Sequence, residues 1–360
     1  MNTEPIFHLL PRHVGQTLAA VLRDCYMTAM RSQTYLADHI DSSEFTSNNN
    51  PITSHTERPA ISWECVRQWI RSRRVTVNGN PCMDDARRMK LQDVVRLLSA
   101  PAPAPPTAQE LRILYLDESI VVVDKPSGIT STRHHDDIMI SGKRRQLQPT
   151  LDELLPKAIS SRFFRANDRA QVLNSSIFAV HRIDRDTSGV LVFARTKTAE
   201  QGLIPQFKTH TTNRQYLAIC MGIVPEKTAT YESRLVRDRG DGLRGSTFDP
   251  DPNVGKRAVT HVERMEILND YSLIKCTLET GRTHQIRIHL LEAGFPLIGD
   301  RIYRKLYRGR TITDHSGAAR TMLHAMTLEI THPLDGQRMR FQSLPPQDFL
   351  DCLRRLAKKT

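Results

Sequence analysis

One short segment combines several side chains that could carry out nucleophilic or acid–base chemistry. Residues 181–189 read His-Arg-Ile-Asp-Arg-Asp-Thr-Ser-Gly and are followed by the apolar run 190–194. That run predicts a strand buried on both faces, and the turn-forming Thr187, Ser188 and Gly189 predict a polar loop leading into it. A carboxylate in such a loop is partly shielded from water, so it must pair with a cation or shift its pKa. The segment is therefore either a surface turn with local ion pairs or a catalytic loop built on a carboxylate.

The order of these residues resembles the signature H-R-L-D-x-x-T-S-G of the RluA-type pseudouridine synthases, with Ile183 in place of Leu. The resemblance implies that Asp184 is the catalytic carboxylate, while Asp186 stands at a variable position and is interpreted as a structural neighbour. Two further segments resemble the same family, Asn-Arg-Gln-Tyr-Leu-Ala at 213–218 and Gly-Arg-Thr-His-Gln-Ile-Arg-Ile-His-Leu at 281–290. They imply that Tyr216 lines the uracil pocket and that Arg287 pairs with Asp184.

Pseudouridine formation breaks a carbon–nitrogen glycosidic bond, rotates the uracil, and joins a ring carbon to the same sugar. This chemistry needs a carboxylate, a cation that keeps it ionised and a pocket for the freed base, but no cofactor. The chain has no glycine-rich phosphate loop and no C-x-x-C pair, so we expect no metal and no cofactor. Asp184 could attack the sugar, attack the base or abstract a sugar proton, and the sequence leaves these routes open.

Other polar residues near these segments are candidates for substrate contacts. We expect RNA contacts from His181, Arg182, Lys125 and Arg282, with His181 alternatively fixing the loop. The run 301–310 mixes arginines and lysine with Tyr303 and Tyr307, which suits phosphate and base contacts or, equally, a solvated surface helix.

The elements that must position these residues follow in order along the chain. Residues 113–116 and 120–125 predict two strands, the second ending in Asp-Lys-Pro, which resembles the family's N-K-P segment. The basic stretch 133–146 predicts a loop, and Thr-Leu-Asp-Glu at 150–153 is a capping box that starts a helix. The resemblance covers about residues 111 to 350. It implies an α+β fold whose catalytic domain has a mixed, mostly antiparallel sheet.

The region before residue 100 has a different organisation. Residues 16–25 predict an amphipathic helix and 26–60 a polar insertion, whereas 62–74 predict a second helix capped by Ser62. Strands are predicted at 75–77 and 94–97, with a hairpin turn at Asn78-Gly79. A helix ending in arginines and followed by Val-Thr-Val-Asn-Gly resembles the small alpha-L RNA-binding module of a ribosomal small-subunit protein. The resemblance implies RNA contacts by three arginines of one helix face, although solvated arginines are the alternative: Arg67, Arg71 and Arg74.

Length and charge bound the organisation of the whole chain. At 360 residues the chain is long enough for two domains, predicted at 1–100 and 111–360 with the proline-rich linker 101–110. The net charge is +12, and an excess of 11 lies after residue 110, so a polyanion is the expected partner. Six separated cysteines predict reduced thiols in the cytoplasm, and no apolar run reaches the ~18 residues of a membrane span. We expect a monomer.

The sequence thus predicts an RNA pseudouridine synthase that flips a uridine out of structured RNA, ribosomal RNA being favoured over transfer RNA. Two alternatives stay open: a non-catalytic RNA-binding or ribosome-assembly factor on the same fold, and a nucleoside glycosidase. The joint presence of Asp184, Tyr216 and Arg287 favours the enzyme over the first. The lack of an obvious second acid–base carboxylate argues against the second.

Overall fold

The computed structural model describes residues 5–31, 61–91, 93–133, 148–164 and 176–358. They form two compact units: the first comprises the residues up to Pro103 together with Gln148, and the second comprises the other residues from Ala104 onward. This division falls within the proline-rich segment predicted to be a linker. Most of the predicted insertion (from residue 32) and of the predicted loop (from residue 134) lies outside the described residues.

The described part of the first unit is an antiparallel sheet of strand order β1-β4-β2-β3, packed against helices α1 and α3. Its elements are β1 (Ile6–His8), the 3₁₀ turn η1 (Pro11–His13), α1 (Leu18–Arg31), α3 (Trp63–Arg71), β2 (Val75–Val77), β3 (Asn80–Pro81) and β4 (Val94–Leu97). Asn78 and Gly79 both have positive φ, as the predicted hairpin turn requires. The helix predicted at 16–25 instead continues to Arg31, because Tyr26, Met27 and Ala29 extend its apolar side against the core.

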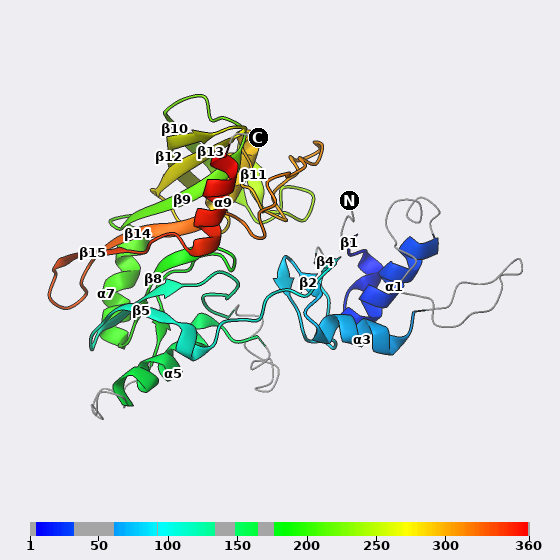
Figure 1. Ribbon diagram of the computed structural model, residues 1–360, viewed down its shortest axis with the longest axis horizontal. Helices are drawn as coiled ribbons and strands as arrows, with labels where there is room; N and C mark the ends of the chain where they lie inside the picture. Colours follow the sequence, from blue (N-terminus) through cyan, green and yellow to red (C-terminus); the bar gives the residue numbers. More distant parts are fainter. Residues whose placement is uncertain (1–4, 32–60, 92, 134–147, 165–175, 359–360) are drawn as a thin grey trace, which may run out of the picture. The chain divides into compact units, whose positions relative to one another are not determined.

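Eleven strands of the described part of the second unit form one sheet, whose main path runs β11-β10-β12-β13-β9-β14-β8-β6-β5 (Figure 1). The strands are β5 (Arg112–Leu116), β6 (Ile120–Lys125), β7 (Phe178–Ala179), β8 (Ser188–Ala194), β9 (Asn213–Met221), β10 (Thr228–Val236), β11 (Gly245–Thr247), β12 (Lys256–Leu268), β13 (Tyr271–Leu278), β14 (Leu323–Thr331) and β15 (Arg338–Gln342). The helices are η3 (Ala108–Glu110), α5 (Leu151–Phe164), α7 (Lys197–Lys208), α8 (Gln285–Glu292) and α9 (Gln347–Ala357). Strands β8 and β14 pair in parallel, whereas every other described pair in this sheet is antiparallel. The predicted α+β class with a mostly antiparallel sheet is confirmed.

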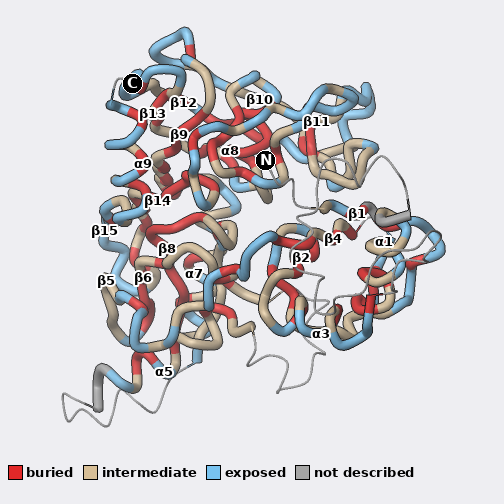
Figure 2. Tube along the Cα trace, turned by 45° about the vertical axis from the view of Figure 1, so that its right-hand side comes forward, coloured by how far each residue is buried: buried red, intermediate tan, exposed pale blue. Residues whose placement is uncertain are grey.

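Strand β8 lies inside the sheet and is buried at every residue (Figure 2). Its alternating side chains enter two different cores: Leu191 and Phe193 join the cluster that includes α5, and Val190 and Val192 join the cluster that includes α7. Helix α8 shares the first cluster through Ile286, while α9 packs on residues of β9 and β13 in a separate cluster. The apolar run after the signature loop is therefore buried on both faces, as its composition predicted.

Within the ranges described above, every helix is too short or too polar to cross a lipid bilayer.

Candidate active site

The signature loop enters β8 through a position that only glycine tolerates. Gly189 has φ +112°, and a Cβ atom there would collide with the backbone of Ala325 on the parallel neighbour β14. At the other end of the loop, Ile183 is buried in the main core, and its neighbour Asp184 keeps 19% of its side chain exposed. The apolar anchor and the close strand contact together hold the Asp184 carboxylate at the edge of the core.

The end of β6 and the segment that follows it donate hydrogen bonds to the backbone of the same loop. The Lys125 Nζ atom donates to the carbonyl oxygens of Pro126, Ile129 and Arg185 at 3.0, 2.8 and 2.8 Å. Ser131 Oγ donates to Ile183 O at 2.8 Å. Lys125 is fully buried, and burial lowers its pKa to about 7. The expectation that Lys125 contacts RNA is therefore wrong, because its three N–H groups are all used inside the protein, where they fix the loop.

Helix α8 presents Arg287 to this loop from the other side of the site. Residues 285–291 of this helix are all buried. Gln285 ties the first turn to the sheet, since its Nε2 atom donates to Val259 O at 2.9 Å and its Oε1 accepts from Thr280 Oγ1 at 2.7 Å. Ile286 lies in the same core cluster as Ile183. The apolar residues that precede Asp184 and Arg287 therefore share one core, which explains how residues about one hundred positions apart come together.

Arg287 lies between two carboxylates. Its Nε and Nη2 atoms donate to the two oxygens of Asp300 at 2.6 and 2.8 Å, and its Nη1 atom donates to Asp184 Oδ2 at 3.3 Å. Asp300 is fully buried and also accepts from the backbone N–H groups of Ile302 and Tyr303. The bidentate pair with Asp300 fixes the plane of the guanidinium, so its remaining N–H is aimed at the exposed carboxylate.

The electrostatic environment keeps Asp184 ionised. Burial opposes ionisation, but His284, Arg287 and Arg182 outweigh it and lower the pKa of Asp184 below its ordinary value. The Nε2 atom of His284 lies 4.0 Å from Asp184 Oδ1, and burial lowers the pKa of this histidine to about 4. His284 is consequently neutral at pH 7, and the arginines supply the positive charge at that pH.

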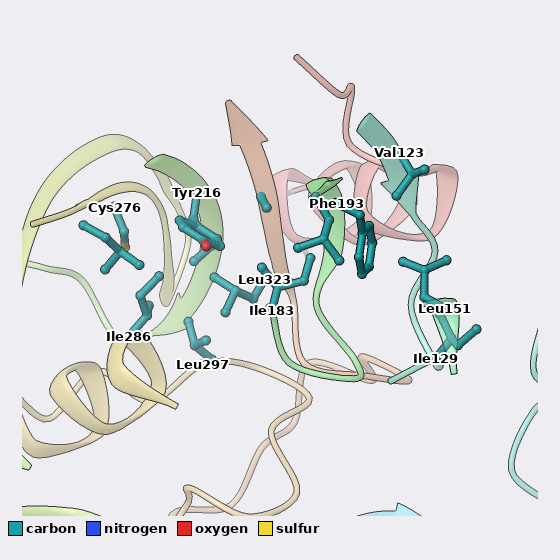
Figure 3. Close-up of a cluster of buried hydrophobic side chains, with 14 of the residues drawn as sticks. Val123, Ile129, Leu151, Ile183, Phe193, Tyr216, Cys276, Ile286, Leu297 and Leu323 are labelled. Carbon is teal, nitrogen blue, oxygen red and sulfur yellow. The ribbon is translucent and has the colours of Figure 1, made fainter. Parts of the chain in front are cut away.

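Tyr216 lies on β9 at the edge of the same core. Its ring is grouped with Ile183 and Ile286, the neighbours of Asp184 and Arg287 (Figure 3). Burial raises the pKa of Tyr216 to about 12, so its hydroxyl stays protonated at pH 7, and Asp184 is among the groups that act on it electrostatically. The structure thus brings Asp184, Tyr216 and Arg287 into one neighbourhood.

The remaining predicted substrate contacts, His181, Arg182 and Arg282, differ in how far their side chains are buried. His181 stacks on Phe207 at 4.2 Å between ring centroids and accepts a hydrogen bond from Val192 N at 3.2 Å, while burial lowers its pKa to about 3. The neutral ring fixes the loop, the second of its two predicted roles. Arg182 is exposed beside Asp184. Arg282 is partly exposed, and its Nε donates to Arg257 O at 3.0 Å.

The basic run 301–310 forms no helix, so the surface-helix alternative is wrong; its residues form bends, a turn at 307–308 and an isolated bridge between Lys305 and Thr311. Tyr303 is 2% exposed and not available to stack on a base. Its hydroxyl bonds His284 Nδ1 at 2.8 Å, and its ring lies 4.8 Å from the Arg287 guanidinium. Tyr303 belongs to the support of the site, whereas Tyr307 and Arg308 of the same run are exposed.

In the first unit the three predicted arginines differ in exposure. Arg67 and Arg71 are exposed on α3 and face Asp85 and Glu64 at 3.7 and 3.1 Å. Arg74 is half-buried, with its Nε donating to Leu98 O at 2.9 Å. Two of the three are therefore accessible for a charged partner.

Asp300 and His284 were not predicted as site residues, and Tyr303 was predicted only as a possible base contact in the run 301–310. A signal for them was present, since Gly-Asp-x-x-Tyr at 299–303 and His284 within Gly-Arg-Thr-His-Gln stand in segments that resemble the synthase family. Their roles depend on side-chain contacts between distant segments, which the spacing does not reveal. In the described part of the chain, no group of three or more His, Cys, Asp or Glu side chains is arranged to hold a metal ion.

Comparison with known proteins defines the class. Residues 119–292 match the model of the family described as RNA pseudouridylate synthase. An uncharacterized RNA pseudouridine synthase of Bacillus subtilis is 31% identical over 298 residues, which cover 81% of this chain and 89% of the relative. The ribosomal large subunit pseudouridine synthase D of Xanthomonas campestris is 31% identical over 299 residues, covering 81% and 83%.

Solved structures agree on the fold. The human RNA pseudouridylate synthase domain containing 4 protein superimposes with a TM-score of 0.53 at 20% identity, covering 68% of this chain and 92% of that structure. Its human relative, domain containing 1, gives a TM-score of 0.50 at 24% identity, covering 69% and 88%. The chain is an isomerase of the uridine-modifying kind. It belongs to the RNA pseudouridine synthase family and, within it, to the RluA type that the signature loop indicated.

Proposed function

We propose that this enzyme converts specific uridines of structured ribosomal RNA to pseudouridine, with Asp184 as the catalytic carboxylate. The observation that carries the proposal is the pairing of a solvent-accessible Asp184 with a buried Arg287, 3.3 Å apart. An ionised carboxylate at the edge of an apolar core can meet a uracil that has left the RNA stack. Removing a base from the stack costs a few kcal/mol.

In the reaction the C1′–N1 bond breaks, C5 of the rotated uracil bonds to C1′, and the proton on C5 is lost while N1 gains one. Asp184 takes part as nucleophile toward the sugar or the base, or as the base that removes a sugar proton. Arg287 keeps it ionised and aimed. The Tyr216 ring is suited to pack against the uracil face, and its neutral hydroxyl is suited to relay the C5 proton. Arg182 is placed to enter the space that the flipped base leaves.

The choice of ribosomal RNA rests on the relatives, several of which are named ribosomal large subunit pseudouridine synthase D. The exposed Arg67 and Arg71 on the first unit suit contacts with a folded RNA, in line with the resemblance to the alpha-L module. A synthase acting on transfer RNA stays an alternative. That the protein works in the cytoplasm, as a monomer and without a cofactor remains a prediction.

Pseudouridine mapping in total RNA tests the proposal. Cells that lack the gene are supplied with the wild-type chain, with Asp184→Asn or with the matched control Asp186→Asn, whose carboxylate pairs with Arg185 at 2.8 Å and is 37% exposed. We expect one or more ribosomal RNA sites to be modified with the wild type and the control, and unmodified with Asp184→Asn. Modification restored by Asp184→Asn would exclude the assigned role, and sites confined to transfer RNA would replace the substrate.

A further inference from the structure

Three arginines of the second unit, Arg182, Arg237 and Arg244, have no carboxylate partner among the described residues. Arg237 and Arg244 stand at the two ends of the hairpin that joins β10 to β11, directly beyond the paired residues Val236 and Gly245. Arg182 precedes Asp184 by two residues in the signature loop. Arg182 and Arg237 are exposed and Arg244 is half-buried. Across the described residues, none of the three takes part in a hydrogen bond or an ion pair through its side chain.

The hairpin that carries Arg237 and Arg244 is fixed by internal bonds. Arg239, whose side chain is 3% exposed, pairs with Asp241 at 3.0 Å and donates to Lys305 O at 2.8 Å. Asp238 Oδ1 accepts from the backbone N–H groups of Gly240 and Gly242 at 2.7 and 2.9 Å. These bonds make the loop a preformed element that is attached to the basic run 301–310.

The hairpin is also bonded to the helix that carries Arg287. On β11, Ser246 N and Oγ donate to the Glu292 carboxylate at 2.9 and 2.5 Å. On β10, the Ser233 hydroxyl bonds His289 Nε2 at 3.1 Å. Both partners lie on α8, so the position of the hairpin is set relative to the catalytic ion pair.

This arrangement places like charges close together. Arg244 is within electrostatic range of Arg237 and Arg182, as well as of Asp184 and Tyr303. Asp184 and Asp300 share Arg287, so this group carries one net negative charge and offsets only one of the three positive charges of Arg182, Arg237 and Arg244. Repulsion among cations held on fixed elements is relieved when an anion binds between them. A phosphate suits them, because a guanidinium can donate two parallel N–H bonds to its oxygens.

We propose that Arg244 and Arg237 bind a backbone phosphate of the RNA next to the uridine presented to Asp184, while Arg182 enters the space that the flipped base leaves. The inference rests on the proposed function and deepens it by naming a substrate-binding group. A phosphate bound at the hairpin between β10 and β11 stays in place while the base turns into the uracil pocket. The contact therefore orients the nucleotide at Asp184 without reading the base sequence.

Binding of a fluorescent decauridylate to the full-length chain, measured by anisotropy over a range of NaCl concentrations, tests the inference. The variants are Arg244→Ala, Arg244→Lys and the matched control Arg354→Ala, which removes an arginine that is 65% exposed on α9. Arg244→Ala is expected to weaken binding about three- to tenfold near 0.1 M salt and to reduce the slope of log affinity against log salt by about 0.7. Arg244→Lys should restore most of both, and Arg354→Ala should match the wild type.

Two results would overturn the inference. One is a salt slope for Arg244→Ala equal to that of the wild type and of Arg354→Ala. The other is a loss that Arg244→Lys does not restore, which would mean that the side chain supports the hairpin instead of a phosphate. The thermal unfolding midpoint of each variant identifies a folding defect. The decauridylate measurement needs no turnover, so its result does not depend on the outcome of the modification test with Asp184→Asn.

Discussion

The two units place arginines on helices in opposite ways. In the first, Arg71 pairs with Glu64 at 3.1 Å while both side chains are about two-thirds exposed. In the second, Arg287 pairs with Asp300 at 2.6 Å with 9% and 0% of the side chains exposed. An exposed pair contributes roughly 0–1 kcal/mol, whereas breaking a buried pair costs about 3–5 kcal/mol. The exposed Arg71 can leave Glu64 and bind a phosphate, whereas the buried Arg287 is held in one orientation by Asp300.

The surroundings of the two helices explain the difference. Helix α3 begins at the Ser62 cap, where the hydroxyl accepts from Cys65 N at 3.1 Å, and it buries Val66 and Ile70 while leaving Arg67 and Arg71 in solvent. Helix α8 is buried on all sides. A charge on α8 therefore needs partners from other segments, and these partners make it part of a site.

The largest effect should come from breaking the buried pair. Asp300→Asn removes the charge that fixes Arg287 and leaves only Asp184 to balance it. We expect the free energy of unfolding to fall by about 3 kcal/mol or more, and single-turnover pseudouridine formation to fall at least about a hundredfold, which corresponds to ~2.7 kcal/mol on the barrier. Urea denaturation and a rapid-quench assay measure the two. Near-normal values in both would mean that Asp300 does not hold Arg287.

Arg287→Lys separates charge from geometry. A lysine keeps the positive charge but cannot make the bidentate pair with Asp300, so the Asp184 carboxylate is no longer held in one orientation. We expect single-turnover modification to fall at least roughly tenfold, equivalent to ~1.4 kcal/mol, while RNA affinity stays nearly unchanged. The matched change in the first unit, Arg71→Lys, should alter neither quantity more than about twofold, because its pair is exposed. A loss of affinity with an unchanged rate at saturation would instead make Arg287 a phosphate contact.

Removal of the first unit should act on binding and leave the catalytic site intact. A chain that starts at residue 108 lacks only the first four residues of the second compact unit, 104–107, and keeps all of its strands. It should unfold cooperatively and bind RNA several-fold more weakly, with a shallower salt dependence, because the phosphate contacts of Arg67 and Arg71 are lost. Titration of one ribosomal RNA fragment at several salt concentrations checks this. Equal affinities and slopes would exclude the first unit from RNA binding.

The smallest effect concerns pH. The pKa of Asp184 is lowered below the ordinary value of ~3.9, so its carboxylate is ionised between about pH 5 and pH 8. Tyr216, with a pKa of about 12, stays protonated over that range. His284, with a pKa of about 4, is neutral over the same range. The single-turnover rate of the wild type should therefore be flat between about pH 5 and pH 6, where Lys125, with a pKa of about 7, also keeps the charge that fixes the loop. A rate that declines below pH 6 would mean that burial outweighs the arginines and raises the pKa of Asp184.

Much of the fold and the catalytic core could be predicted from the sequence. Strand β8 follows from an unbroken apolar run, the β2–β3 turn from Asn-Gly, and the start of α3 from Ser62. These signals are local, because backbone preference and side-chain periodicity act over a few residues. The order of residues in the signature loop, together with its resemblance, predicted Asp184 as the catalytic carboxylate, and the corresponding segments predicted Tyr216 and Arg287 as its neighbours.

Only the tertiary structure decided which polar residues are exposed and which are enclosed. Lys125 was expected to contact RNA, and Tyr303 stands in a basic run that suited base contacts, yet both are buried and bonded within the protein. Asp300 stands in a segment that resembles the family, but that segment did not indicate its pairing with Arg287, and Arg244 gave no local signal of its role. The role of a charged side chain depends on its neighbours. Those neighbours come from strands and helices that meet only when the sheet has formed. The sequence alone determined the chemistry that the loop can perform, and the folded chain determined which cations hold its carboxylate in place.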